Sequence, residues 1–218
     1  MQPPLPYRVQ HQNLWLSSER CIYWEEEKTL IVSDLHFGKT GHFRKFGIPV
    51  PQSVYKQDLQ RLVHQIQFFQ PRQLIVVGDL FHSRENKELE LFRKWRQDFP
   101  GLDIHLVMGN HDILHHTWYQ ESGISITEEE LQINSFRFRH DIGSQANSPE
   151  HYFFSGHIHP GVCIKGPGRQ SLRFPCFYFA RDYCVLPAFS RFTGVALIDP
   201  SDGENVFAIV NNTIVQLQ

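Results

Sequence analysis

The sequence predicts an α/β protein, because helical and strand-like segments alternate in the first half of the chain and strand-like segments dominate the second half. Residues 20–24 and 29–33 are β-rich runs around a charged turn, and they predict a hairpin. Short apolar runs at 74–77 and 104–108 are typical of strands buried on both faces. We therefore expect a single domain over residues 1–218, built on one large mixed sheet or on two facing sheets.

Helical patterns separate these strands. Residues 52–69 follow Pro51 and carry apolar side chains three or four positions apart, as the buried face of a helix does. Residues 86–98 show similar spacing, and a short helix is expected to end near Gln120. The first half therefore reads β-α-β-α-β.

The second half predicts strands with little helix between them. Residues 130–133 and 136–140 flank Asn134-Ser135, which predicts a hairpin turn, and residues 152–155 form a further strand-like run. Other strand-like runs, broken by Gly or Pro, occur near residues 161–165, 171–180, 193–198 and 205–216.

Composition favours a soluble globular protein. The net charge of -2 excludes binding to nucleic acid through a positive charge of the whole molecule, although a local basic patch is compatible with it. Neither a secretion signal nor an apolar stretch of about 18 residues occurs, so we expect a cytoplasmic protein without a membrane segment. Because no C-x-x-C pair occurs, free thiols are expected at the four cysteines, Cys21, Cys163, Cys176 and Cys184.

Four predicted strands each end in a cluster of Gly, Asp, Asn and His. The clusters are SDLH at 33–36, GDLFH at 78–82, GNHD at 109–112 and GHIH at 156–159. Ligand sites in open α/β sheets lie beyond the carboxyl ends of the strands, so these side chains are expected to meet. In extended backbone, the first and third residues of D-x-H and H-x-H point to the same side.

The candidate ligands are oxygen atoms and imidazole nitrogens. This set suits two divalent ions, with Mn²⁺, Fe or Zn²⁺ as candidates, better than calcium or a thiolate zinc site. Such a pair polarises a phosphate and activates a water molecule for in-line attack. Each motif alone has a structural explanation, since G-D after a strand is often a turn or a helix cap. The four clusters together, in this order, favour the metal site.

SDLHFGK, GDLFHS, GNHD and GHIHP resemble the calcineurin-like metallophosphoesterases over about residues 30 to 160. The resemblance implies two facing mixed β-sheets flanked by helices, a four-layer sandwich. It also implies that the first metal is held by Asp34, His36 and His159, that Asp79 bridges, and that the second metal is held by Asn110, His140 and His157.

The same resemblance implies two catalytic residues outside the metal ligands. His111 would protonate the leaving oxygen or stabilise charge on the phosphate, and Asp112 would orient His111. The sequence departs from the family pattern after His140, where Asp141 replaces the usual Gly, so a surface histidine remains an alternative there.

A narrower resemblance is to the bacterial DNA-ligase-associated metallophosphoesterases, also called PdeM. It rests on residues 34–51, on GDLFHSR at 78–84 and on LPAF at 186–189. That subfamily is associated with endonuclease or phosphodiesterase activity in DNA repair, beside a DNA ligase, an exonuclease and a helicase. The resemblance implies the same substrate and partners here, and a homodimer is compatible with the sequence.

Substrate contacts are predicted at Lys39, Arg44 and Lys45, which follow the first metal motif, and at His82. Solvated charges and a structural histidine are the alternatives. A later segment interleaves aromatic residues with basic residues that include Lys165, Arg169 and Arg173, a pattern shared by single-strand binding surfaces and by ordinary core strands.

Three functions remain open on the sequence alone. The first is a nuclease or phosphodiesterase acting on DNA, and the second is a phosphatase or phosphodiesterase acting on a small nucleotide-like ester. The third is a non-catalytic metal-binding scaffold, against which His111 and Asp112 argue, since a structural site needs neither.

Overall fold

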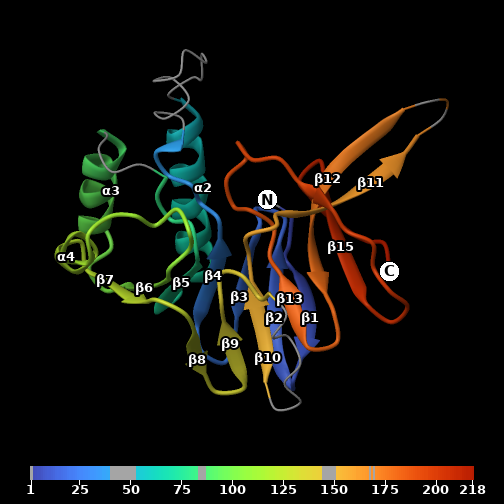
Figure 1. Ribbon diagram of the computed structural model, residues 1–218, viewed down its shortest axis with the longest axis horizontal. Helices are drawn as coiled ribbons and strands as arrows, with labels where there is room; N and C mark the ends of the chain where they lie inside the picture. The colour runs from blue at the N-terminus through green and yellow to red at the C-terminus, as the bar shows by residue number, and fades with distance from the viewer. Residues whose placement is uncertain (1, 40–52, 83–86, 144–150, 167, 169) are drawn as a thin grey trace.

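The protein is a sandwich of two β-sheets with helices packed on one side (Figure 1). The computed structural model describes residues 2–39, 53–82, 87–143, 151–166, 168 and 170–218. Within this part of the chain, no helix is both long enough and apolar enough to cross a membrane.

The first sheet has the order β1-β2-β3-β4-β5-β6-β7. Its strands are β1 (Leu5–Val9), β2 (Gln12–Ser17), β3 (Cys21–Trp24), β4 (Thr29–Ser33), β5 (Gln73–Val77), β6 (Asp103–Val107) and β7 (Ile124–Thr127). The strands from β1 to β4 pair antiparallel, and those from β4 to β7 pair parallel. The parallel half therefore places the carboxyl ends of β4, β5 and β6 side by side.

The second sheet has the order β14-β11-β12-β13-β10-β9-β8, with β15 paired to β12 and β16 to β15. Its strands are β8 (Leu131–Ile133), β9 (Phe136–Phe138), β10 (Tyr152–Ser155), β11 (Pro160–Lys165), β12 (Ser171–Phe179), β13 (Tyr183–Val185), β14 (Ala196–Leu197), β15 (Asn205–Val210) and β16 (Thr213–Gln216). The strand β10 pairs parallel with both β9 and β13, so the sheet is mixed.

Three described helices cover the outer face of the first sheet, namely α2 (Ser53–Phe69), α3 (Lys87–Gln97) and α4 (His116–Glu121). They bury Leu62, Phe92 and Tyr119 against alternate residues of β4 and β5, such as Val32 and Val76. This alternation follows from the pleat of the strands, which sends successive side chains to opposite faces.

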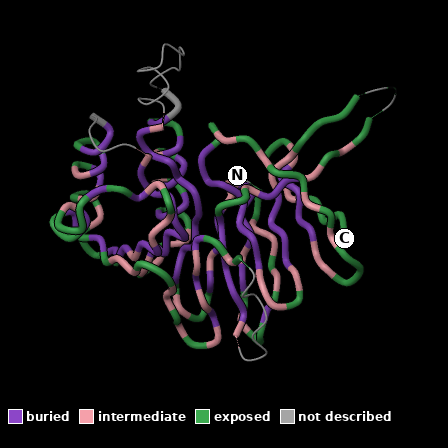
Figure 2. The backbone as a smooth tube through the Cα atoms, in the orientation of Figure 1, coloured by how far each residue is buried: buried purple, intermediate pink, exposed green. Residues whose placement is uncertain are grey.

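The inner faces of the two sheets enclose a second core. Ile31 and Val77 of the first sheet pack there with Phe154, Phe177 and other aromatic residues of the second sheet. Figure 2 shows that the central strands of the sandwich are buried, while the loops at its edges are exposed. The core thus fixes β4, β5 and β6 from both faces.

The predicted architecture of two facing mixed sheets with flanking helices is confirmed. On the outer face of the second sheet, a small cluster around Cys176 and Val206 is packed by Ile198, which follows β14. In the described part of the chain the helices lie on the first sheet, and extended segments cover the outside of the second. All four cysteines are unpaired.

The strongest sequence patterns correspond to observed elements. The predicted hairpin is β3–β4, the two longer helices are α2 and α3, and the predicted apolar strands are β5 and β6. The sequence patterns did not identify β1, β2, β7 or β13. The tight turn between β1 and β2 has positive φ at both Gln10 and His11, a conformation usually signalled by Asn or Gly.

Packing between the sheets predicts a large difference between two phenylalanines. Phe154 is fully buried and its ring centroid lies 4.9 Å from that of Phe136, whereas Phe68 on α2 is 53% exposed. Phe154→Ala is expected to lower the free energy of unfolding by about 3–5 kcal/mol, and Phe68→Ala by less than about 1 kcal/mol. Urea denaturation of both variants measures the difference, and equal losses would contradict a tightly packed interior between the sheets.

Candidate metal centre

The candidate site lies at one end of the sandwich, where the loops after β4, β5, β6 and β10 meet. Backbone hydrogen bonds join the first two loops, with the N–H of His36 donating to the carbonyl of Asp79 at 2.8 Å. The N–H of His111 donates to Oδ1 of Asp79 at 2.9 Å, and the N–H of His157 donates to Oδ2 of Asp34 at 3.0 Å. Loops from both sheets are therefore fixed to the same two carboxylates.

One group of candidate ligands is Asp34, His36 and His159. The Nε2 atoms of His36 and His159 face each other at 3.2 Å, and Oδ1 of Asp34 lies 3.4 Å from Nε2 of His159 and 3.9 Å from Nε2 of His36. Their potential ligand atoms lie within 4.8 Å of one another. These are the residues that the resemblance assigns to the first metal.

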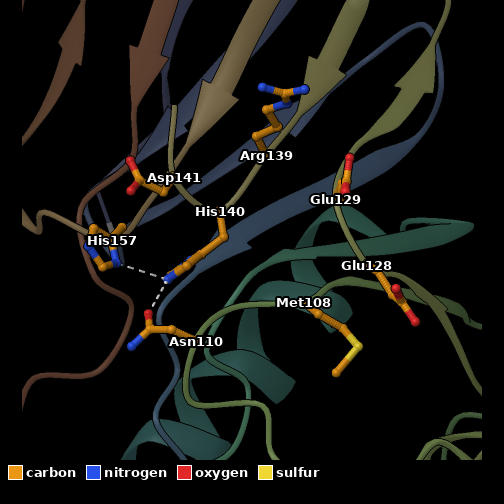
Figure 3. A pocket seen from close by; sticks show the side chains of 8 residues that line it. All are labelled: Met108, Asn110, Glu128, Glu129, Arg139, His140, Asp141 and His157. Atoms are coloured by element: carbon orange, nitrogen blue, oxygen red, sulfur yellow. Dashed lines mark hydrogen bonds between the residues drawn. The ribbon is translucent and has the colours of Figure 1, made fainter. Parts of the chain in front are cut away.

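A second group surrounds Nε2 of His140. It lies 3.1 Å from Oδ1 of Asn110 and 3.1 Å from Nδ1 of His157 (Figure 3). Oδ1 of Asp79 is 3.5 Å from the same nitrogen. The other ring nitrogen, Nδ1, is 3.3 Å from the carbonyl oxygen of Val77. If it donates there, Nε2 carries a lone pair directed at the cluster.

Asp79 lies between the two groups. Its Oδ2 atom is 3.9 Å from Nδ1 of His36, while Oδ1 faces His140 at 3.5 Å. Asp34 also reaches both groups, because its Oδ1 atom lies within 4.0 Å of Nδ1 of His140. The structure thus brings all seven predicted ligands together, including His140, which lies buried in the site rather than on the surface.

The charge balance of this cluster fits bound cations. Oδ1 of Asp34 and Nδ1 of His36 are buried, and neither forms a hydrogen bond with the described residues. Two imidazole nitrogens facing each other at 3.2 Å cannot both be hydrogen-bond acceptors, whereas a shared cation would satisfy both. Oxygen and imidazole donors without thiolate suit Mn²⁺, Fe or Zn²⁺.

The protonation states also favour metal binding. Burial lowers the pKa of His36 to about 2, with the charge of Lys39 acting in the same direction, so its imidazole is neutral and can donate a lone pair. Burial acts to raise the pKa of Asp34, but His159 and His140 outweigh it, and the pKa lies below its usual value. Asp34 is therefore ionised at neutral pH.

The backbone at the ligands is left-handed. Asp34, His36, Asp79, His157 and His159 all have positive φ, between 49° and 67°. Each such non-glycine residue costs of order 1–3 kcal/mol and persists only where the surrounding structure enforces it. The loops turn sharply directly after the strands, and this turn aims neighbouring side chains into the cluster.

Glycines allow the loops to approach one another. A Cβ atom at Gly78 would collide with the ring of His140, and one at Gly156 would collide with the side chains of Ser33 and Asp34. The glycines of the G-D and G-H-x-H motifs are therefore required by close contacts at the ligands.

His111 lies at the edge of the site and packs against His82. Their ring centroids are 4.2 Å apart, and those of His111 and His36 are 5.7 Å apart. His82 is also 5.6 Å from His36. Both predicted residues thus lie beside the first ligand group, and the ring of His82 packs against that of His111.

Asp112 contacts the backbone of two loops of the site. Its carboxylate accepts hydrogen bonds from the backbone N–H groups of Phe81 at 3.1 Å and Gly109 at 2.9 Å, which joins the loops after β5 and β6. Burial raises its pKa to about 7, although these two hydrogen bonds act to lower it. Asp112 therefore holds the backbone of both loops, and its orientation of His111 stays a prediction.

Of the predicted substrate contacts, Lys39 lies beside the site. Burial lowers its pKa, and the charges of Asp79 and Asp34 oppose that shift, which places its ammonium group within their field. Arg44 and Lys45 lie outside the described residues.

A cavity of about 430 Å³ opens beside the second ligand group (Figure 3). Asn110 and His157 are exposed there, so the site is accessible to solvent. Three acidic residues, Glu128, Glu129 and Asp141, and one basic residue, Arg139, contribute to the cavity lining. This side of the site is therefore mainly acidic.

The sequence did not reveal the support beneath Asp34. Backbone N–H groups of Phe189 and Ser190 donate to the carbonyls of Ser33 at 2.7 Å and Asp34 at 3.2 Å. Arg61 donates to the carbonyl of Phe189 at 3.0 Å and stacks on its ring, with Cζ 4.4 Å from the ring centroid. LPAF at 186–189 was the only sequence signal for this support.

Arg61 is itself held by two acids. It forms ion pairs of 2.7 Å with both Glu19 and Asp58, and Asp58 also accepts a hydrogen bond from Oγ of Ser190 at 3.0 Å. Both Arg61 and Asp58 are buried. This network fixes the loop that supports the metal-site end of β4.

Comparison with known proteins agrees with this geometry. A sequence profile of the calcineurin-like phosphoesterases matches residues 27–171, more than half of the chain. The structure of Pseudomonas putida nuclease MPE matches with a TM-score of 0.83 and 27% sequence identity, covering 98% of this chain and 100% of that one. Yfce, a phosphoesterase from E. coli, matches with a TM-score of 0.42 and 14% identity, covering 87% of this chain and 97% of that one. No curated protein matches at a significant level.

The close approach at Gly156 can be tested by adding one methyl group. Gly156→Ala is expected to displace Asp34 and weaken Mn²⁺ binding at least tenfold, with about 1–3 kcal/mol of lost stability from overpacking. Gly101→Ala is the matched control, because no atom lies within 4 Å of a Cβ at that position. Isothermal titration with Mn²⁺ measures the affinity, and unchanged binding in Gly156→Ala would refute the steric argument.

Removal of Arg61 should destabilise the protein through the charges left behind. Arg61→Ala removes the arginine that pairs with the buried Asp58, while Glu19 keeps its ion pair with Arg191 at 3.1 Å, and a loss of about 3–5 kcal/mol is expected. Arg72→Ala, which truncates an exposed arginine before β5, is expected to cost less than about 0.5 kcal/mol. Chemical denaturation compares the two, and similar small losses would show that the network contributes little.

Proposed function

Since this chain belongs to the calcineurin-like phosphoesterase family, we propose that it is a nuclease that hydrolyses phosphodiester bonds of DNA with two divalent metal ions. Metal-dependent phosphoester hydrolysis follows from the family and from the cluster of carboxylates and imidazoles. The choice of a nuclease goes further, and one observation carries it. The match to Pseudomonas putida nuclease MPE extends over nearly the whole of both chains at 27% identity.

The first metal ion would be held by Asp34, His36 and His159, and the second by Asn110, His140 and His157, with Asp79 between them. Bound there, divalent ions would supply a Lewis acid for the phosphate and lower the pKa of a water molecule. Mn²⁺ is the preferred metal in this proposal, with Fe and Zn²⁺ as alternatives.

His111 would act on the leaving group. Its backbone N–H is fixed to Asp79, and its ring stands next to the first ligand group, against His82. From there its imidazolium can donate a proton to the departing oxygen or a hydrogen bond to the phosphate. His82 would act as a positioning residue for that ring.

The exposure of the candidate ligands to solvent supports a polymeric substrate. Asn110 and His157 are exposed, so a polymer can cross the site without entering a closed pocket. Against this, the cavity of about 430 Å³ beside His140 is large enough for a nucleotide-sized group. A phosphatase or phosphodiesterase acting on a small nucleotide-like ester is therefore the second candidate.

A role in DNA repair, beside a DNA ligase, an exonuclease and a helicase, is part of the proposal and rests on the subfamily resemblance of residues 34–51, 78–84 and 186–189. Co-purification of the native protein with such enzymes would test it.

Substitution of His111 separates catalysis from metal binding. His111→Ala is expected to retain Mn²⁺ binding while turnover falls by about 10²–10⁴-fold, as the loss of a general acid does. His64→Ala, which truncates an exposed histidine on α2, serves as the control. This variant should keep both the Mn²⁺ affinity and the turnover of the unaltered protein. The assays are isothermal titration with Mn²⁺ and cleavage of a labelled 30-nucleotide DNA, single-stranded and duplex.

The same assays separate the candidate functions. Cleavage of the DNA by the unaltered protein supports the nuclease. Brisk hydrolysis of a small phosphate ester without cleavage of either DNA would overturn the nuclease in favour of the second candidate. Unchanged turnover in His111→Ala would refute the role of that histidine.

A further inference from the structure

A long β-hairpin projects from the sandwich directly after the ligand His159. It consists of residues 160–165 of β11 and 171–175 of β12, which we call the arm. Figure 1 shows the arm extending away from the other long strands of the second sheet, and Figure 2 shows that its outer half is exposed. At about 3.3 Å per residue, six residues of β11 carry the arm about 20 Å beyond His159.

The register gives the arm two different faces. Val162 lies opposite Phe174, and Ile164 lies opposite Leu172, so these apolar side chains share one face. Val162 packs against the core cluster on the outside of the second sheet, which anchors the base of the arm. The apolar face therefore attaches the base of the arm to the second sheet.

The other face is polar and basic. Cys163 lies opposite Arg173, and Lys165 lies opposite Ser171, and all four residues are exposed. Lys165 and Arg173 are thus diagonal neighbours on paired strands, a position in which Cα atoms lie about 7–8 Å apart. Their like charges repel each other. No Asp or Glu occurs between Pro160 and Arg181, so the arm lacks an acid of its own to neutralise them.

The charge of the arm contrasts with the opposite side of the site. The cavity beside His140 is lined by Glu128, Glu129 and Asp141, which repel phosphates. Lys39 lies close to the Asp34 side, and the arm continues from His159. A polyanion crossing the site is therefore repelled from the acidic cavity and attracted towards the arm.

We propose that the basic face of the arm binds the phosphate backbone of a nucleic acid at a distance from the scissile bond, through Lys165 and Arg173. This inference rests on the proposed nuclease function and adds a substrate-binding surface to it. A strand rising 3.4 Å per nucleotide covers 20 Å in about six nucleotides. Because Arg173 lies opposite Cys163, about 13 Å along the arm, and Lys165 about 20 Å along it, the arm acts on substrates that extend about four to six nucleotides from the cleaved bond.

The test compares long and short substrates in the full-length protein. Lys165→Glu/Arg173→Glu is expected to lower, at least tenfold, the ratio of kcat/KM for a 30-nucleotide DNA to that for bis(4-nitrophenyl) phosphate. The loss should appear in KM, because the arm does not touch the reacting atoms. For 30-nucleotide DNA, the slope of log affinity against log salt concentration should fall by roughly 1.4–1.8, which corresponds to two phosphate contacts.

The matched control carries the same change of net charge elsewhere. Arg72→Glu/Lys94→Glu alters two exposed residues, one before β5 and one on α3, far from the arm on the helical side (Figure 1). This variant should keep the ratio of the unaltered protein. An equal loss in the control would mean a general charge effect and would overturn the proposal.

Further outcomes separate this inference from the proposed function. If the arm variant cleaves DNA as well as the unaltered protein does, the proposed role of the arm is overturned and the proposed nuclease function is not affected. Cleavage of bis(4-nitrophenyl) phosphate without binding of DNA by the unaltered protein overturns both. A change from dimer to monomer in the arm variant by analytical ultracentrifugation, with DNA affinity retained, would assign the arm to contact with a second copy instead.

Discussion

Two buried carboxylates that face one small space impose the main constraint on this structure. Asp34 and Asp79 are almost fully buried, and they lie one and two residues after the ends of the central strands β4 and β5. Two buried negative charges without compensation would be strongly unfavourable. The backbone N–H groups of His111 and His157 compensate part of the charge. Bound divalent cations would balance the remainder, since Oδ1 of Asp34 is buried without a hydrogen-bond partner among the described residues.

The same constraint explains why so much strained backbone gathers at one end of the sandwich. Five ligand residues have left-handed φ values, at a total cost of about 5–15 kcal/mol if each costs about 1–3 kcal/mol. That cost is comparable with the whole stability of a domain, so it must be offset by packing nearby. The helices on one face and the second sheet on the other hold β4 and β5 in place, and Arg61 with Phe189 braces the end of β4. The strained backbone at the site therefore depends on the packing of the two hydrophobic cores.

Strands and site residues were predictable to different extents for physical reasons. The parallel strands β5 and β6 are short apolar runs because they are buried on both faces, and each directly precedes a ligand motif. Six candidate ligands lie in motifs at such strand ends, whereas His140 was chosen from the resemblance to the calcineurin-like metallophosphoesterases. In contrast, β1 and β2 were not predicted, because Gln10 and His11 form the turn between them without Asn or Gly. The hydrogen bonds of Asp112 and the contact between Arg61 and Phe189, 128 residues apart, leave no local pattern.

Charge around the site is distributed unevenly, and this accounts for how a protein with a net charge of -2 could handle a polyanion. Binding and orientation depend on the local field within about a Debye length, roughly 8 Å at physiological salt, rather than on the sum of charges. Acidic Glu128, Glu129 and Asp141 occupy one side of the ligand cluster, whereas Lys39 and the basic face of the arm extend from the other. A small phosphate ester reaches only the metal ligands and their immediate neighbours. Only a chain of phosphates is long enough to meet both sides, so the asymmetry favours one direction of approach for a polymer and has little effect on a monomer.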